Sequence, residues 1–247
     1  MPFVLTVLGT AATYPRPSEP CSGYLTRTPH SALWIDTGPG TFTALQEHLD
    51  PSELTGVWIS HLHPDHCADL LSLTNWALNT PTAPRLPVHG PPGWAHHLAA
   101  FLPIPQALEH LHRIYDIHEH DTAPHQHHDL TLRTTPVHHS APTWALRLDH
   151  DHTSLTYSAD TGPCPELPDL AHHTDLLICE AGTTTPSPHH CTPHDAAHIA
   201  NQAQTRTLLI THTPNPEDRD TATHTAQQTA HCPVRAATPG QHHTPNT

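Results

Sequence analysis

The stretch HLHPDH, residues 61–66, carries the strongest chemical pattern in the chain. It follows a short apolar run at residues 56–60 that is typical of a buried strand, and it precedes residues 67–79, whose apolar spacing predicts a helix. Three imidazoles and a carboxylate between a strand and a helix indicate a transition-metal site. Residues two apart in extended backbone point the same way, so His61 and His63 can hold one metal, while Asp65 and His66 turn towards a second.

The histidine content limits the weight of this pattern, because the chain contains 30 histidines in 247 residues. An HxHxxH spacing arises by chance somewhere in such a chain with a probability of roughly one third, and requiring the aspartate lowers it to roughly a few per cent. The His-rich segments that begin at His118, His125 and His150 lie in polar stretches. We expect these to be solvated loop histidines.

Six residues cannot complete two metal sites, so further ligands must come from later strand ends. The pair His138-His139 follows the apolar strand pattern of residues 130–137. Asp160 follows a strand at residues 154–159, and His212 follows one at residues 207–211. Each of these residues alone is a weak candidate, but their ordered occurrence after HxHxDH predicts one shared centre.

Composition excludes several classes of protein. There is no lysine, and nine arginines stand against 23 acidic residues, giving a net charge of −14. Nucleic-acid binding depends on cationic side chains, so we do not expect nucleic acid as a partner. Six cysteines without a CxxC pair predict reduced thiols. With no membrane-length apolar stretch and no leader-like N-terminus, we expect no membrane partner and a cytoplasmic protein.

The order of elements predicts an α/β fold, a four-layer αββα sandwich of two mixed sheets with helices outside. We expect a single domain over residues 1–240, a polar tail at residues 241–247, and fraying from residue 238 onwards. Strands are expected at residues 3–8, 21–25, 32–35, 57–60, 86–90, 114–117, 130–137, 144–148, 154–159, 176–179 and 207–211. Helices are expected at residues 41–49, from residue 65 or 68 to about 80, at 93–101 and at 193–203.

Several motifs in order resemble the metallo-β-lactamase fold hydrolases: HLHPDH, a histidine before PTWALRL, YSADTG and LLITHT. The segments LGTAATYP, CSGYL and WIDTGPGT resemble the branch of that family that contains ribonuclease Z, arylsulfatase and cyclic-nucleotide phosphodiesterase relatives. The resemblance extends from residue 4 to about residue 240. The resemblance favours His139 over His138 as a metal ligand, because HSAPTWALR, which begins at His139, resembles the family's ligand histidine and the residues that follow it.

The resemblance implies a complete set of ligands for two Zn²⁺ ions, with Mn²⁺ or iron as alternatives. One metal would be held by His61, His63 and His139, the other by Asp65, His66 and His212, and Asp160 would bridge the two. Asp36, in WIDTGPGT, resembles the aspartate that supports the metal loop without binding metal. The segment HCTPHDAA resembles the one that carries a catalytic histidine, which makes His190 the candidate, with His189 and His194 beside it. Glu180 would orient His190.

These features predict an enzyme, a binuclear metal-dependent hydrolase. A metal-bound hydroxide would attack phosphorus or a carbonyl carbon, with Asp65 and His190 handling protons. The resemblance favours a phosphodiester of a small molecule as substrate, and by family analogy a homodimer. The alternatives are a tRNA 3′-processing endonuclease, a lactone or thioester hydrolase, and a non-catalytic metal-binding protein.

Overall fold

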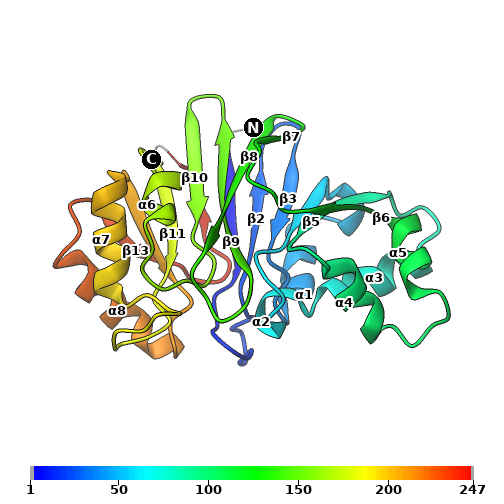
Figure 1. The fold of residues 1–247 in the computed structure, drawn as a ribbon, viewed down its shortest axis with the longest axis horizontal. Helices are drawn as coiled ribbons and strands as arrows, with labels where there is room; N and C mark the ends of the chain where they lie inside the picture. Colours follow the sequence, from blue (N-terminus) through cyan, green and yellow to red (C-terminus); the bar gives the residue numbers. More distant parts are fainter. Residues whose placement is uncertain (1–2, 246–247) are drawn as a thin grey trace.

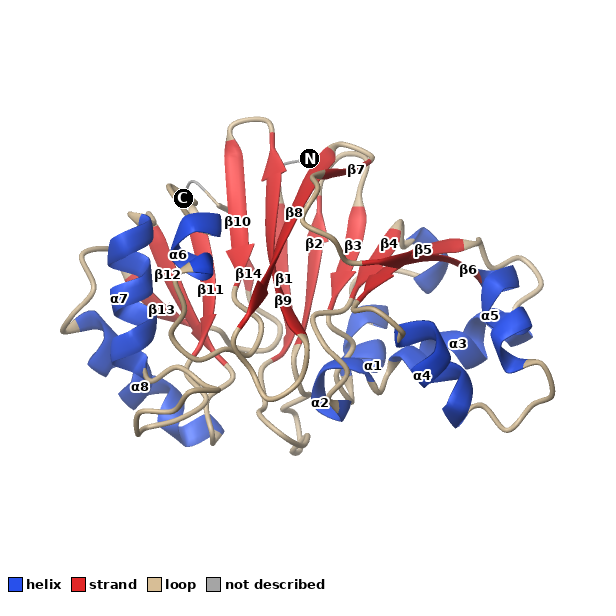
Figure 2. Cartoon of the chain, in the orientation of Figure 1, coloured by secondary structure: helices blue, strands red, loops and turns tan. Residues whose placement is uncertain are grey.

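The computed structural model describes residues 3–245, so Met1, Pro2 and the last two residues of the predicted tail lie outside the described residues. Within that range the strands form two sheets of seven, packed face to face with helices on both outer faces (Figure 1, Figure 2). The predicted αββα fold class is therefore confirmed. No helix in this part of the chain is long and apolar enough to cross a membrane.

The first sheet has the strand order β14-β1-β2-β3-β4-β5-β6. Neighbouring strands are antiparallel from β14 to β3 and parallel from β3 to β6, which makes the sheet mixed. The bounds are β1 Val4–Gly9, β2 Gly23–Arg27, β3 Ala32–Ile35, β4 Gly56–Trp58, β5 Leu86–Gly90, β6 Tyr115–Glu119 and β14 His242–His243.

The second sheet has the strand order β13-β12-β11-β10-β9-β8-β7. Its strands are antiparallel from β7 to β10 and parallel from β10 to β13. The bounds are β7 His125–His127, β8 Leu130–Val137, β9 Thr143–His150, β10 Thr153–Tyr157, β11 Leu176–Glu180, β12 Thr207–Thr211 and β13 Val234–Ala236.

Three apolar clusters separate the four layers. Strand β3 shows why: Leu33 and Ile35 join the cluster between the sheets, whereas Trp34 joins the cluster under the outer helices. Side chains alternate across a strand, so an uninterrupted apolar strand is buried on both faces. The helices are α1 Thr41–Gln46, α2 Pro64–Cys67, α3 Leu70–Asn79, α4 Trp94–Phe101, α5 Ala107–Ile114, α6 Glu166–Leu170, α7 Pro193–Ala203 and α8 Arg219–Gln227, with 3₁₀ turns η1 Pro51–Glu53 and η2 Pro216–Asp218.

Helices α5, α6 and α8 and strands β7 and β13 were not predicted from the sequence. Helix α8 buries only the small side chains of Ala222 and Ala226, which give little periodicity to distinguish a helix from a polar loop. Helix α5 does carry a helical apolar spacing, since Leu108, Leu111 and Ile114 pack into the cluster under the outer helices, and this pattern could have predicted it. Tertiary packing, rather than local pattern, stabilises these short elements.

The end of the chain differs from the predicted polar, frayed tail at residues 241–247. His242 and His243 form β14, which pairs with Thr6 and Leu5 of β1. The Thr6 hydroxyl also lies 2.9 Å from His242 Nδ1. The open edge of β1 supplies the backbone partners, so this polar dipeptide becomes a strand without any apolar pattern of its own.

The His-rich segments also differ from the expectation of solvated loops. His118 lies on β6, His125 on β7 and His150 on β9. Within these segments His120 and His127 are buried. His120 stacks on Trp58, with ring centroids 4.9 Å apart, and its Nε2 donates to the Ile59 carbonyl at 2.7 Å. These two histidines are structural, because a buried imidazole is stable when it is hydrogen-bonded.

The fold brings several strand ends to one side of the molecule. Parallel strands β10, β11 and β12 end next to one another, and β4 of the other sheet ends at Trp58, close to Asp36 at the end of β3. Ala159, Asp36 and His212 at these ends have positive φ angles of 54°, 53° and 52°. Non-glycine residues rarely adopt this backbone conformation, and they concentrate at functional sites.

Candidate metal centre

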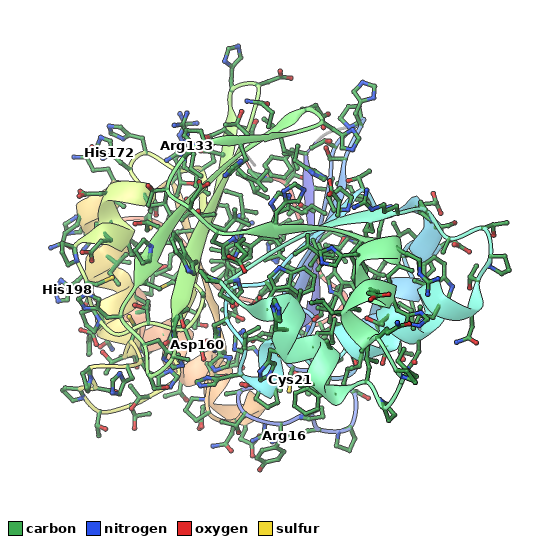
Figure 3. The ribbon with its side chains drawn as sticks, turned by 45° about the vertical axis from the view of Figure 1, so that its right-hand side comes forward. Arg16, Cys21, Arg133, Asp160, His172 and His198 are labelled. Carbon is green, nitrogen blue, oxygen red and sulfur yellow. The ribbon has the colours of Figure 1, made fainter. Side chains whose placement is uncertain are left out.

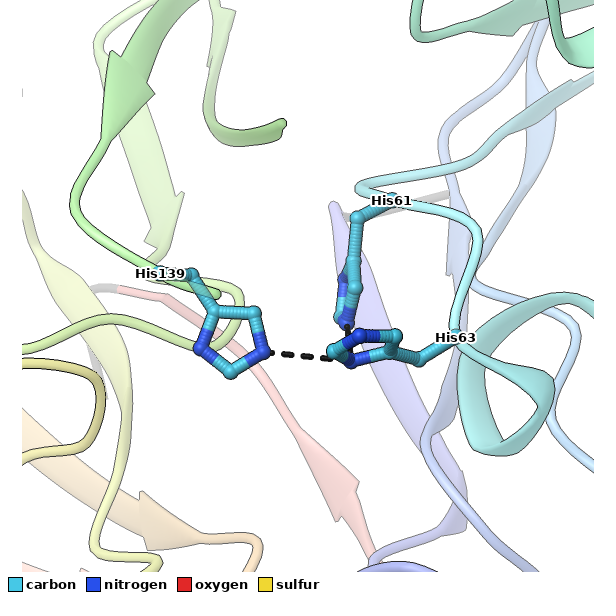
Figure 4. Close-up of side chains that lie close together, drawn as sticks. All are labelled: His61, His63 and His139. Atoms are coloured by element: carbon cyan, nitrogen blue, oxygen red, sulfur yellow. Dashed lines mark hydrogen bonds between the residues drawn. The ribbon is translucent and has the colours of Figure 1, made fainter. Parts of the chain in front are cut away.

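Three histidines from two separate loops converge at these strand ends (Figure 4). His61 Nε2 lies 3.0 Å from His63 Nδ1, and His139 Nε2 lies 3.2 Å from the same nitrogen. His63 therefore faces its partners through Nδ1, while the other two use Nε2. The loop after β8 carries His139, so two sheets are needed to assemble this group.

A second group consists of Asp65, His66, Asp160 and His212, all of which are buried. Asp160 lies at the centre: its Oδ1 is 3.3 Å from His66 Nε2, and its Oδ2 is 3.2 Å from His212 Nε2. Its Oδ2 is also 3.9 Å from His139 Nε2. This carboxylate therefore faces both groups, as a bridging ligand would.

Two buried atoms at the centre form no hydrogen bond. His66 Nε2 and Asp160 Oδ1 are shielded from solvent, and although they lie 3.3 Å apart, neither has a hydrogen bond within the described residues. Buried polar atoms in native proteins are nearly always satisfied. A cation between these atoms would satisfy both of them, and a set of imidazole nitrogens and carboxylate oxygens suits zinc, manganese or iron. The residues present therefore fit the predicted metal pair.

The remaining ring nitrogens are held by neighbouring groups. His61 Nδ1 lies 3.0 Å from the Ser60 hydroxyl, His212 Nδ1 lies 3.0 Å from the Ser22 hydroxyl, and His139 Nδ1 donates to the His189 carbonyl at 2.8 Å. Such contacts fix the orientation of an imidazole and leave the opposite nitrogen free for a metal. Ser22 and Ser60 were not predicted as site residues, because single serines at strand ends carry no distinctive pattern.

Asp36 lies outside both groups and supports them. Its Oδ2 accepts hydrogen bonds from His66 Nδ1 at 2.7 Å and from the Tyr157 hydroxyl at 2.8 Å. Its Oδ1 accepts the Ser60 backbone N–H at 2.7 Å. This is the supporting position that the resemblance implied for Asp36. Pro64, the first residue of α2, turns the chain so that Asp65 and His66 enter the second group.

The electrostatics of the centre reflect its burial. Burial raises the pKa of Asp160, but the adjacent His212 and His66 outweigh burial and hold it well below the ordinary value. Burial lowers the pKa of His66, but Asp160 and Asp36 outweigh it and raise the pKa well above its ordinary value. Burial lowers the pKa of His61, which favours its neutral form. The opposed directions follow from burial combined with the close approach of carboxylates to imidazoles.

Glu180 and His190 form a pair beside the centre. Glu180, at the end of β11, is buried, and its Oε1 accepts a hydrogen bond from His190 Nδ1 at 2.9 Å. This hydrogen bond raises the pKa of His190 above its ordinary value, against the effect of burial. Nitrogen or oxygen atoms of His190, His139 and Asp160 lie within 4.8 Å of one another. The pair therefore lies next to residues of both ligand groups.

Local sequence explains why His190 reaches this place. Thr192 caps α7 by accepting the Asp195 N–H at 3.1 Å, and Asp195 accepts the Thr192 N–H at 2.9 Å. This capping box fixes where the helix begins and so where the preceding loop ends. Of the neighbours named in the sequence analysis, His194 contacts Thr229 at 3.0 Å, away from the centre. His189 is exposed, and its ring centroid lies 6.3 Å from that of His139.

His138 is also separated from the centre. Its Nε2 lies 3.9 Å from Glu166 Oε2, and its side chain is 60% exposed, whereas the His139 side chain is 2% exposed. The structure thus brings together His61, His63, Asp65, His66, His139, Asp160, His212, Glu180 and His190, which are the residues singled out from the sequence.

A two-sheet sandwich with a His and Asp centre at its strand ends defines a protein of the metallo-β-lactamase fold. Residues 32–213 match the Beta-lactamase superfamily domain, and the chain belongs to that family, so the resemblance is confirmed. It is 37% identical over 242 residues to an uncharacterized protein of Mycobacterium tuberculosis (strain ATCC 25618 / H37Rv), covering 94% of this chain and 88% of that one. It is 30% identical over 237 residues to ribonuclease Z of Mycobacterium bovis (strain BCG / Pasteur 1173P2), covering 84% and 85%.

Solved structures agree on the fold. The metallo-beta-lactamase fold protein YhfI from Bacillus subtilis has a TM-score of 0.88 at 22% identity, covering 98% of this chain and 100% of that one. A diphosphatase of the PhnP family has a TM-score of 0.78 at 17% identity, covering 98% and 97%. At these identities the likeness shows the fold alone.

Proposed function

We propose that this protein is a binuclear metal-dependent hydrolase that cleaves a phosphodiester of a small molecule. The observation that carries the proposal is the position of Asp160, which faces both ligand groups, with the Glu180–His190 pair beside it. A ribonuclease and a diphosphatase, both of which act at phosphorus, are among the proteins that this chain is similar to. The family membership supports hydrolysis, and these two likenesses favour phosphate esters.

His61, His63 and His139 would hold one metal, and Asp65, His66 and His212 the other, with Asp160 between them. When bound, the metal pair would supply an acidified water as nucleophile and stabilise negative charge on the phosphoryl oxygens. Zn²⁺ is the proposed metal, and Mn²⁺ or iron would suit the same ligand atoms.

Asp65 is placed to handle the proton of the attacking water. Its Oδ2 accepts the backbone N–H of Thr13 at 2.9 Å, which fixes the direction of the carboxylate. A carboxylate held in this way can take a proton from a water on its free side.

His190 is placed to give a proton to the leaving oxygen. Glu180 holds Nδ1, so the opposite nitrogen, Nε2, carries the proton to be transferred. Because the hydrogen bond with Glu180 raises the pKa of His190, the protonated form persists to a higher pH than in a free imidazole. A general acid of this kind typically accelerates a reaction by about 10² to 10⁴-fold.

A cavity of about 500 Å³ lies between α7, α8 and the segments that follow β11 and β12, lined among others by Ala181, Thr192 and Pro214. Cavities of about 300–1,000 Å³ are typical of small-molecule sites. Its lining includes none of the proposed metal ligands, so the support for a small-molecule substrate comes from its size alone.

Hydrolysis assays on protein of measured metal content test the proposal. The panel should contain an activated phosphodiester, a cyclic phosphodiester, a lactone and a thioester. We expect turnover of the phosphodiesters. Failure to cleave any of them with zinc or manganese demonstrably bound would contradict the proposal, and turnover confined to the lactone or thioester would reassign the substrate.

Ribonuclease activity is a second candidate, favoured by the 30% identity to ribonuclease Z. The absence of lysine and the net charge of −14 oppose it, because binding of a polyanion releases counterions only where cationic side chains replace them. Specific cleavage of precursor tRNA at physiological salt would decide in its favour. The predicted homodimer and cytoplasmic location stay predictions from the sequence.

A further inference from the structure

A loop between β1 and β2, residues 10–22, crosses the metal centre. Near its start the Thr13 N–H binds Asp65 Oδ2 at 2.9 Å, and at its end the Ser22 hydroxyl lies 3.0 Å from His212 Nδ1. Arg16 lies midway along this loop. Figure 3 shows Arg16 and Cys21 at the same end of the molecule as Asp160.

The backbone around Arg16 is firmly held. Arg16 and Glu19 exchange two backbone hydrogen bonds of 2.9 Å, which closes a tight turn. The Glu19 carboxylate then accepts from Arg219 at 2.8 Å, and Arg219 also donates to Thr10 at 3.1 Å. Glu19 is therefore occupied by Arg219 and leaves the Arg16 guanidinium without a carboxylate partner among the described residues.

The guanidinium itself is only partly satisfied. Its Nη2 donates to the Pro214 carbonyl at 3.1 Å, and its Cζ lies 4.5 Å from the centre of the Tyr14 ring. Its Nη1 is shielded from solvent and has no hydrogen-bond partner in the described part of the chain. An unsatisfied buried donor costs about 1–3 kcal/mol, and more when the group is charged. A ligand oxygen at this atom would remove that cost.

The loop holds Arg16 close in the chain to contacts with the centre: Thr13, three residues earlier, bonds Asp65 Oδ2, and Arg16 Nη2 bonds the carbonyl of Pro214, two residues after His212. Burial raises the pKa of the nearby Cys21 thiol to about 12, and on this thiol the charges of Asp65 and Arg16 act in opposite directions. The net charge of −14 disfavours the approach of anions, so a fixed cation at this position would matter for a negatively charged substrate.

We propose that Arg16 binds a non-bridging oxygen of the substrate's phosphoryl group, and that this contact makes the enzyme select anionic phosphate esters over neutral esters. The inference rests on the proposed phosphodiester hydrolysis and adds a specificity-determining residue to it. Guanidinium suits this role because its planar fork matches phosphate oxygens and its charge is permanent. Tyr14, which is 60% exposed, lies over the guanidinium, and we expect its ring to move aside when a substrate oxygen binds Nη1.

The test compares Arg16→Gln and Arg16→Lys with the matched control Arg85→Gln. Arg85 is an exposed arginine that pairs with Asp116 at 3.4 Å on the far sheet edge. Two readouts are needed: calorimetric binding of inorganic phosphate, and kcat and KM for bis(4-nitrophenyl) phosphate and for the neutral ester 4-nitrophenyl acetate. Metal content and Tm are measured for every variant.

We expect Arg16→Gln to weaken phosphate binding by roughly tenfold or more, as for a lost hydrogen bond to a charged group. KM for the phosphodiester should rise while kinetics with the neutral ester stay near wild type. Arg16→Lys should recover part of the loss because it keeps the charge, and Arg85→Gln should match wild type.

Phosphate binding by Arg16→Gln within about twofold of wild type would overturn the inference. So would the absence of phosphate binding by the wild type, or a fall in Tm or metal content that accounts for the loss, since that would give Arg16 a structural role in the loop. Failure of the proposed function is distinguishable: the wild type would not cleave the phosphodiester, while phosphate binding would still depend on Arg16.

Discussion

The carboxylate of Glu180 accepts a hydrogen bond from His190 Nδ1 at 2.9 Å, although the two residues lie ten positions apart on a strand end and a loop. Glu180 is fully engaged: its Oε1 also accepts the Thr161 N–H at 2.8 Å, and its Oε2 accepts the Gly182 N–H at 2.6 Å. A carboxylate fixed by three donors holds the imidazole in one orientation. The His190 ring therefore faces the centre with a defined tautomer.

Substitution Glu180→Gln should shift the pH dependence of kcat. Glu180 raises the pKa of His190, and a general acid loses activity as pH rises through its pKa, so removing the negative charge should move the basic limb of the profile to lower pH. We expect kcat at neutral pH to fall by about 10²-fold with metal content unchanged. The check is a pH–rate profile of both proteins. An unmoved basic limb would show that His190 is not the titrating acid.

The substitution Gly182→Ala should break the hydrogen bond between Glu180 and His190 by steric crowding, without changing any charge. A Cβ at this position would lie 2.8 Å from Glu180 Oε2 and 2.9 Å from His190 Nδ1, closer than real Cβ atoms approach. Because the crowded atoms are side-chain ends, the fold should survive while the hydrogen bond is displaced. We expect a large fall in kcat with a change in Tm of only a few degrees. Gly93→Ala serves as the control. Gly93 has open space around it, but its φ of +84° strains any other residue, so this variant should lower Tm without changing kcat.

Asp160→Ala should remove tightly bound metal. Asp160 faces His66, His139 and His212, so both proposed metals lose a ligand when it is replaced. We expect metal content measured by mass spectrometry to fall from about two ions per chain to one or none, and activity to fall with it. His118→Ala is the matched control, since His118 lies on β6 with a side chain 43% exposed. If the protein instead bound many metal ions weakly, the Asp160→Ala and His118→Ala variants would lose similar amounts of metal.

Stability should fall on acidification because of His120, a buried histidine outside both ligand groups. Burial lowers the pKa of His120 from its ordinary 6.5 to about 4. The unfolded chain therefore binds a proton below pH 6.5 that the folded chain refuses until about pH 4, so stability is complete above 6.5 and is lost as pH falls towards 4. The loss from this one group reaches about 3 kcal/mol.

The variant His120→Gln tests this by keeping a donor for the Ile59 carbonyl while removing the titration. Its free energy of unfolding, measured with urea between pH 7 and pH 4, should depend less steeply on pH than that of the wild type. His127, whose pKa burial lowers to about 4, remains in both proteins, so the slope should decrease without vanishing. If the free energy of unfolding depended on pH equally in both proteins, the lowered pKa of His120 would be contradicted.

The amino-acid sequence by itself determined the class of fold and most of the candidate centre. Apolar runs such as residues 32–35 and 207–211 fix strands of buried sheets, and ligand-type residues directly after those strands lie at one edge of the sheets for any chain with this topology. The order of Asp65, His139, Asp160 and His212 along the chain therefore predicted one shared centre, even in a chain with 30 histidines.

The resemblance favoured one of several similar residues in the sequence, and only the tertiary structure gives the physical reason for the choice. His138 and His139 are adjacent in sequence, yet one faces Glu166 and the other faces Asp160, because successive residues point to opposite sides of an extended chain. His120 and His127 became core residues, and β14 formed from a polar tail, because each found a partner from a distant segment. Arg16 likewise acquired its position from Pro214 and Tyr14, contacts that no local pattern around residue 16 encodes.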